Sequence, residues 1–161
     1  MKVAIAADHR GASMIAHVVQ LLQQHGCEVV ECSPASTRMC DYPDMAFPVA
    51  QAVAAGAAER GILICGSGIG MSIAANKVKG VRAALVHDEI GAEISRRHND
   101  ANVLCLPADL LGVKLVERIV AMWINAGFEG GRHARRVAKI AAIEDGRDPT
   151  LITDTEEATT G

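Results

Sequence analysis

RGILICGSGIGMSIAANK, residues 60–77, is the stretch of sequence that decides the fold. The apolar run 62–64 suits a buried strand, and it leads through Cys65 directly into a glycine-rich turn. Glycines within 66–70 let the backbone turn sharply with its N–H groups pointing inward, and the dipole of a helix that begins near Gly68 adds partial positive charge. The stretch therefore predicts a strand–turn–helix unit that binds an anion beside a cysteine.

This turn does not match the common nucleotide-binding motifs. GSGIG has the form G-x-G-x-G, and Met71 stands where the third glycine of G-x-G-x-x-G belongs. The P-loop pattern also fails, because no lysine directly follows the relevant glycine. A glycine-rich turn can be purely structural, but Cys65 at the end of the strand and Ser67 two residues later favour a functional one.

Composition limits the classes of protein that the chain can belong to. Its 161 residues suffice for one domain with a core, and half of them are hydrophobic. Only one Trp, one Tyr and two Phe occur, so the core is expected to consist of Ala, Val, Ile, Leu and Met. A formal net charge of -3 gives no general attraction to nucleic acid or to an anionic membrane.

The cysteines and the N-terminus favour a cytoplasmic protein. Five cysteines form no C-x-x-C pair and no Cys/His cluster with the spacing of a zinc site, so we expect neither disulfides nor a structural metal. The first apolar run is too short for a signal peptide, and no segment has the apolar length that crosses a bilayer.

Strand-like and helix-like segments alternate five times along the chain. Strands are expected at 2–7, 27–32, 62–65, 81–87 and 103–106, and helices at 11–25, from an Asp44 cap to about Ala57, and at 68–78, 89–97 and 109–125. This alternation predicts an α/β fold, a three-layer αβα sandwich with a Rossmann-like parallel five-stranded sheet. A C-terminal helix at 132–144 completes a single domain, 1–147, and the polar residues 148–161 are expected to form a flexible tail.

Ligands of such folds gather at the carboxyl ends of the strands. The polar residues expected near that edge are Asp8, His9, Cys65, His87 and Asp88, with His98 and Asn99 just past the helix that precedes the fifth strand.

Five motifs together carry a family resemblance. They are DHRG at 8–11, DYPD at 41–44, ICGSGIGMSIAANK at 64–77, RRHND at 96–100 and GGRHARR at 130–136. On these motifs, in order from residue 2 to about residue 147, the sequence resembles ribose-5-phosphate isomerase B, which belongs with the galactose-6-phosphate and allose-6-phosphate isomerases. The resemblance implies an aldose–ketose isomerase that needs no metal and no cofactor.

The resemblance also implies catalytic roles. Cys65 matches the base that moves a proton between C2 and C1 through a cis-enediolate, and His98 matches the acid/base that first opens the sugar ring. Ser67, often threonine in relatives, is placed to pass a proton between O1 and O2. Backbone N–H groups of the turn match the enediolate hole, at Gly66, Gly68, Ile69 and Gly70. Taken alone, Cys65 could equally be a buried inert cysteine, Ser67 a turn residue and His98 a helix cap.

The remaining matched residues bind substrate. Arg132 and Arg136 match the phosphate ligands, and their spacing of four puts them on one helix face, which suits capture of a dianion. His9 and His133 fit the same end of the substrate, and Asp8, Tyr42 and Asn99 fit the sugar end. The alternative for the arginines is a solvated helix face.

In this family the cysteine loop of one subunit faces the C-terminal arginines of its partner, which implies a homodimer, and some relatives form tetramers. The leading interpretation is interconversion of ribose 5-phosphate and ribulose 5-phosphate, a step of the non-oxidative pentose phosphate pathway. The alternatives are a six-carbon substrate (allose 6-phosphate or galactose 6-phosphate), a tetrulose phosphate, or a non-catalytic phosphosugar-binding module.

Overall fold

One parallel sheet of five strands forms the centre of the protein. The computed structural model describes residues 1–32 and 38–153. The strands are β1 (Lys2–Ala7), β2 (Glu28–Glu31), β3 (Arg60–Cys65), β4 (Ala83–Leu85) and β5 (Val103–Pro107), in the order β2-β1-β3-β5-β4. All neighbouring strands pair in parallel. The chain winds outward in both directions from the β1–β3 pair, which is therefore the point where the strand order reverses.

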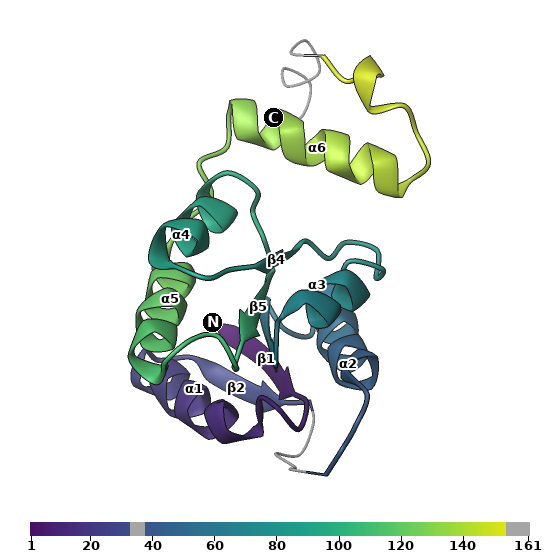
Figure 1. Cartoon of the computed structure of the whole chain (residues 1–161). Coiled ribbons are helices and arrows are strands. Elements are labelled where there is room, and N and C mark those ends of the chain that lie inside the picture. The colour runs from purple at the N-terminus through teal and green to yellow at the C-terminus, as the bar shows by residue number, and fades with distance from the viewer. Residues whose placement is uncertain (33–37, 154–161) are drawn as a thin grey trace.

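Helices cover both faces of the sheet (Figure 1). The helices are α1 (Ala12–Gln24), α2 (Tyr42–Ala54), α3 (Ile69–Ala75), α4 (Glu89–Arg97), α5 (Val113–Asn125) and α6 (Arg132–Glu144), followed by the 3₁₀ turn η1 (Pro149–Leu151). α1, α4 and α5 pack on one face around the fully buried Trp123, and α2 and α3 pack on the other. Successive strand residues face opposite layers, and Cys65 belongs to the α2–α3 side.

The predicted α/β sandwich with a five-stranded parallel sheet is confirmed, but several boundaries differ. β3 begins at Arg60, not at 62, and α2 and α3 end at Ala54 and Ala75, three residues before their expected ends. α2 begins at Tyr42 with Asp41 at its N-cap, and Asp44 lies in the first turn, not at the cap. β4 covers only Ala83–Leu85, not 81–87, and the side chain of Asn76 bonds the N–H and the carbonyl of Ala83 (both 2.9 Å).

Another difference lies after β5. α5 begins at Val113, not at 109. The backbone N–H groups of Ala108 and Asp109 donate instead to the carbonyls of Cys65 (2.8 Å) and Gly66 (3.0 Å). These residues therefore brace the cysteine turn and start no helix.

α6 stands away from the three layers, beyond the edge where the strands begin (Figure 1). At its far end, Glu144 accepts from the N–H of Gly80 (2.9 and 3.0 Å) and Asp145 pairs with Lys79 (2.6 Å). Of the predicted flexible tail, residues 154–161 lie outside the described residues, and 148–153 include η1.

Within residues 1–32 and 38–153, every helix falls short of the length and apolar character that a membrane span requires.

Candidate functional site

The cysteine turn wraps its backbone around a buried sulfur. Cys65 ends β3, is only 4% exposed, and its Sγ accepts the N–H of Gly68 at 3.1 Å. Gly68 has φ +72°, and a Cβ there would lie 2.4 Å from Cδ1 of Leu85. Only glycine fits this left-handed, crowded position without strain. The Oγ of Ser67 accepts the N–H of Ile69 at 3.3 Å. The first amides of α3 thus converge on the thiol and the hydroxyl.

Asp8 and His9 lie beside this turn, because β1 and β3 end together. Ala7 pairs with Ile64, and the N–H of Asp8 donates to the Ile64 carbonyl at 3.1 Å. The buried carboxylate of Asp8 accepts the N–H groups of Arg10 (2.9 Å) and Gly11 (3.1 Å) through Oδ1. Asp8 is thereby fixed one strand away from Cys65.

An ion pair and an aromatic ring frame the turn. Arg10 donates to Asp109 from Nη2 (2.6 Å) and Nε (3.1 Å), and a Cβ on Gly66 would lie 2.6 Å from Oδ2 of Asp109. On the other side, the ring of Tyr42 lies 2.6 Å from the position of a Cβ on Gly70. A side chain at either glycine would therefore force Asp109 or Tyr42 to move. The Arg10–Asp109 pair was not predicted from sequence, because its members are 99 residues apart.

A second group of predicted site residues lies elsewhere. His98 ends α4, and the carbonyl of the next residue, Asn99, accepts from Nε of Arg82 (3.1 Å), just before β4. A helix that follows a strand of a parallel sheet returns to the edge where strands begin. The six residues of β3, at about 3.3 Å each, then put roughly 20 Å between this group and the end of β3 at Cys65.

His98 and Asn99 thus lie at the amino edge of the sheet. Of the polar residues expected at the carboxyl edge, Asp88 caps α4 by accepting the N–H of Gly91 (2.6 Å).

Two histidines stack at the junction of α4 and α6. The rings of His98 and His133 are 4.1 Å apart between centroids and 5° from parallel. Oε2 of Glu129 lies 3.6 Å from Nε2 of each ring. Arg132, beside His133, donates from Nε to Nε2 of His133 (3.4 Å). Sequence reasoning missed Glu129, although an acid four residues before His133 and next to the Gly130–Gly131 pair was a usable signal.

Charged neighbours set the ionisation of this cluster. Arg97 donates to Oε1 of Glu129 from Nε (2.7 Å), and this contact lowers the pKa of the Glu129 carboxyl. Burial lowers the pKa of His133, and the nearby His98, Arg132 and Arg136 lower it further. His133 is therefore held as the neutral imidazole, and Glu129 as the carboxylate.

The same cluster is poorly suited to a metal ion. Among the described residues, His98, Glu129 and His133 form the group whose potential ligand atoms all lie within 4.8 Å of one another. The lone pair of an imidazole nitrogen lies in the ring plane, so two parallel stacked rings do not aim at a common point. Arg97 and Arg132 already bind Glu129 and His133. The cluster suits proton transfer and anion binding.

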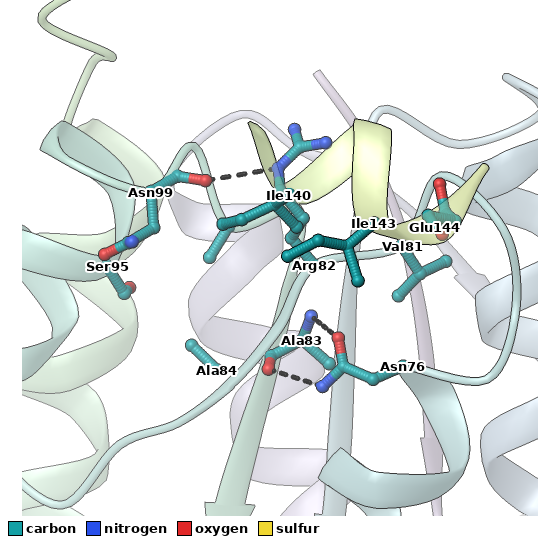
Figure 2. Close-up of a pocket in the computed structure, with 11 residues that line it drawn as sticks. Asn76, Val81, Arg82, Ala83, Ala84, Ser95, Asn99, Ile140, Ile143 and Glu144 are labelled. Atoms are coloured by element: carbon teal, nitrogen blue, oxygen red, sulfur yellow. Dashed lines mark hydrogen bonds between the residues drawn. The ribbon is translucent and has the colours of Figure 1, made fainter. Parts of the chain in front are cut away.

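A cavity of about 440 Å³ separates α6 from the amino edge of the sheet. Figure 2 shows Ile140 and Ile143 of α6 above the Asn76–Ala83 contact, with the Arg82–Asn99 contact beside Ile140. Its lining is mainly apolar, and it contains neither Cys65 nor Arg132 and Arg136. The cavity is therefore a gap beneath α6, not the place where the predicted residues meet.

Known proteins resemble this chain in sequence. The model of the family described as Ribose/Galactose Isomerase matches residues 3–140. The chain belongs to that family. Ribose-5-phosphate isomerase B of Escherichia coli is 44% identical over 147 residues, covering 91% of this chain and 99% of that one. The predicted relationship to this isomerase is confirmed.

Solved structures share the fold. Ribose-5-phosphate isomerase B of Clostridium thermocellum superposes with a TM-score of 0.89 at 45% identity, covering 91% of this chain and 99% of that one. The enzyme of Mycoplasma genitalium, solved with bound ribulose 5-phosphate, superposes with a TM-score of 0.86 at 42% identity, covering 89% and 96%.

Gly68→Ala is expected to destabilise the protein more than Gly80→Ala. Both glycines have positive φ (+72° and +84°), but a Cβ on Gly80 meets nothing within 4 Å. Each variant loses about 1–2 kcal/mol from the left-handed backbone, and Gly68→Ala loses roughly 1–3 kcal/mol more from overpacking against Leu85. Urea unfolding measures the difference, and equal losses would contradict the crowding at Gly68.

Acid is expected to weaken the fold through His133. Because its folded pKa is lowered, the unfolded chain binds the proton more readily. The neutral His133 side chain contributes fully to the free energy of unfolding above the unfolded pKa of about 6.5. This contribution is lost as the pH falls below that value. Urea unfolding at successive pH values should show a smaller acid loss in His133→Gln than in wild type. An identical loss in both proteins would refute the assignment.

Proposed function

We propose that this protein is an aldose–ketose isomerase that interconverts D-ribose 5-phosphate and D-ribulose 5-phosphate. The observation that carries the proposal is the Cys65 thiol, which lies within a turn of backbone amides at the point where the strand order reverses. The relatives of known structure include one that binds ribulose 5-phosphate. Five free cysteines fit a reducing compartment, and we place the enzyme in the cytoplasm.

Proton transfer at carbon falls to Cys65. The thiolate removes the proton from C2 of the open-chain aldose and returns it to C1, through a cis-enediolate whose negative charge develops on the sugar oxygens. The N–H groups of Gly66, Gly68, Ile69 and Gly70 stabilise that charge, and each well-placed donor lowers the barrier by about 3 kcal/mol. The exposed hydroxyl of Ser67 passes the second proton between O1 and O2.

Ring opening falls to His98. Its imidazole takes the proton of the anomeric hydroxyl and donates one to the ring oxygen, and a histidine does both near neutral pH. Asp8, Tyr42 and Asn99 bind the sugar hydroxyls in this scheme. The exposed Arg132 and Arg136, with His9 and His133, bind the phosphate.

These groups act on one substrate only if two chains combine. Within one chain the end of β3 at Cys65 and the His98 cluster are separated by roughly 20 Å. α6 stands away from the three layers of its own chain, and two of its side chains, Ile140 and Ile143, are 43% and 62% exposed. Near the cysteine turn, large apolar side chains are also exposed, at Tyr42, Phe47, Ile69 and Ile73. We infer a homodimer in which α6 of one subunit reaches the cysteine turn of the other, and two such dimers can pair into a tetramer.

Cys65→Ala is expected to lower kcat for ribose 5-phosphate by roughly 10²- to 10⁴-fold, the usual contribution of an acid/base group. Cys105→Ala is the matched control, because Cys105 lies on the neighbouring strand β5 and its burial raises the pKa of its thiol. That control should keep most of its turnover. Unchanged turnover in Cys65→Ala would refute Cys65 as the base.

The same assay decides the substrate. Wild type should turn over ribose 5-phosphate faster than allose 6-phosphate, galactose 6-phosphate or erythrulose 4-phosphate. A higher kcat/KM for one of the other three sugar phosphates would show that it is the substrate. Tight binding without turnover would show that the protein is a phosphosugar-binding module.

Mixed dimers test the shared site. Cys65→Ala and His98→Ala should each be inactive alone. In a dimer of one chain of each, one of the two shared sites draws both residues from unmutated positions. Random pairing makes half of the dimers mixed, so coexpression should restore about a quarter of wild-type activity. No recovery in demonstrably mixed dimers would show that Cys65 and His98 act within one chain.

A further inference from the structure

The carboxylate of Glu129 divides its two oxygens between different partners. Oε1 binds the guanidinium of Arg97, and the N–H of Glu129 donates to the Arg97 carbonyl at 3.0 Å. Both contacts fix Glu129 against the end of α4. Oε2 is left facing the stacked rings of His98 and His133, at 3.6 Å from Nε2 of each.

Only one of the two rings offers Glu129 a proton. Nε2 of His133 accepts from Nε of Arg132 at 3.4 Å, so this nitrogen carries a lone pair and no hydrogen. A carboxylate is acceptor-only and gains nothing from facing a lone pair. The favourable contact of Oε2 is therefore with an N–H at Nε2 of His98.

His133 has a different part in the cluster. It is 5% exposed and parallel to His98, so its ring is a flat support that fixes the tilt of the more exposed His98 imidazole. Stacking sets the plane of that ring, but it does not set which nitrogen points where. A charged partner at one nitrogen can do that, and Oε2 of Glu129 lies at ion-pair distance, 3.6 Å, from Nε2 of His98.

We propose that Glu129 is a positioning residue for ring opening: it holds Nε2–H of His98, which leaves Nδ1 of that ring to exchange protons with the sugar. This inference rests on the proposed isomerase function and adds a residue to it. Among the described residues, Nδ1 of His98 has no hydrogen-bond partner. The arrangement matches the general rule that a carboxylate on one imidazole nitrogen fixes the tautomer at the other.

Other charges surround His98 but do not take this place. From α4, Arg97 binds Glu93 (2.6 Å) as well as Glu129. From α6, Arg132 and Arg136 bring positive charge to the His133 side. Glu129 alone of these groups has a carboxylate oxygen within ion-pair distance of His98.

The test compares Glu129→Gln with Glu93→Gln. Both replace a carboxylate on Arg97 by an amide of the same shape, but only Glu129 faces His98. Kinetics with ribose 5-phosphate measure turnover from the closed ring. The Ki of an acyclic phosphorylated hydroxamate, which mimics the enediolate and has no ring to open, measures whether the rest of the site is intact.

Glu129→Gln should lower kcat for ribose 5-phosphate by roughly tenfold to a hundredfold, with the Ki of the hydroxamate within about twofold of wild type. Glu93→Gln should change neither quantity. Because Glu129 acts through His98, adding Glu129→Gln to His98→Asn should cause no further loss.

Three results would overturn the role of Glu129: unchanged kcat in Glu129→Gln, a parallel loss of kcat and hydroxamate affinity, or a full further loss on the His98→Asn background. Turnover by wild type distinguishes these three results from a failure of the proposed isomerase function. Wild type that turns over no ribose 5-phosphate removes both proposals, whereas normal wild-type turnover with any of the three results removes Glu129 alone.

Discussion

Parallel pairing of β1 with β3 is the constraint on which the rest of the structure depends. Their register ends both strands at the same level, with Ala7 opposite Ile64, so Asp8 and Cys65 leave the sheet side by side. Gly11 makes this possible, because a Cβ there would lie 2.7 Å from the carbonyl oxygen of Ile64. Each strand end is then held from outside the sheet, Asp8 by amides of its own loop and the Cys65 turn by the amides of Ala108 and Asp109.

The same parallel geometry separates the two groups of site residues. Each helix must return the chain to the edge where the next strand starts, so a side chain at the end of α4 lies one strand length from a side chain at the end of β3. No movement of a loop closes such a distance while the sheet stays intact. A second chain removes the difficulty, because the amino edge of one sheet can meet the carboxyl edge of another, and this is why the proposed active site needs a dimer.

Sequence patterns predicted the order and type of the elements, because hydrophobic periodicity and glycines act locally. They failed where a partner distant in sequence decides the outcome. The start of α5 moved from 109 to Val113 because the N–H groups of Ala108 and Asp109 bond the cysteine turn. β4 covers only Ala83–Leu85, and the side chain of Asn76 bonds the backbone of Ala83 from outside the sheet. Motif resemblance named Cys65 and His98 but not their separation, and it passed over Glu129, whose partners become neighbours only when α4 and α6 meet.

Electrostatics explain why two histidines of one cluster differ. The chain is negative overall, yet Arg97, Arg132 and Arg136 gather at the α4–α6 junction, where a phosphate would need them. A buried imidazole among these cations is disfavoured as a cation itself, and His133 accordingly accepts a hydrogen bond from Arg132. His98 is more exposed, and its ring faces the carboxylate of Glu129. Two acids, Glu93 and Glu129, among three arginines still leave net positive charge for the phosphate, and Glu129 gives one imidazole a negative partner. The two histidines thus have different roles. Burial makes His133 a support, and the position of the Glu129 carboxylate leaves His98 to transfer protons.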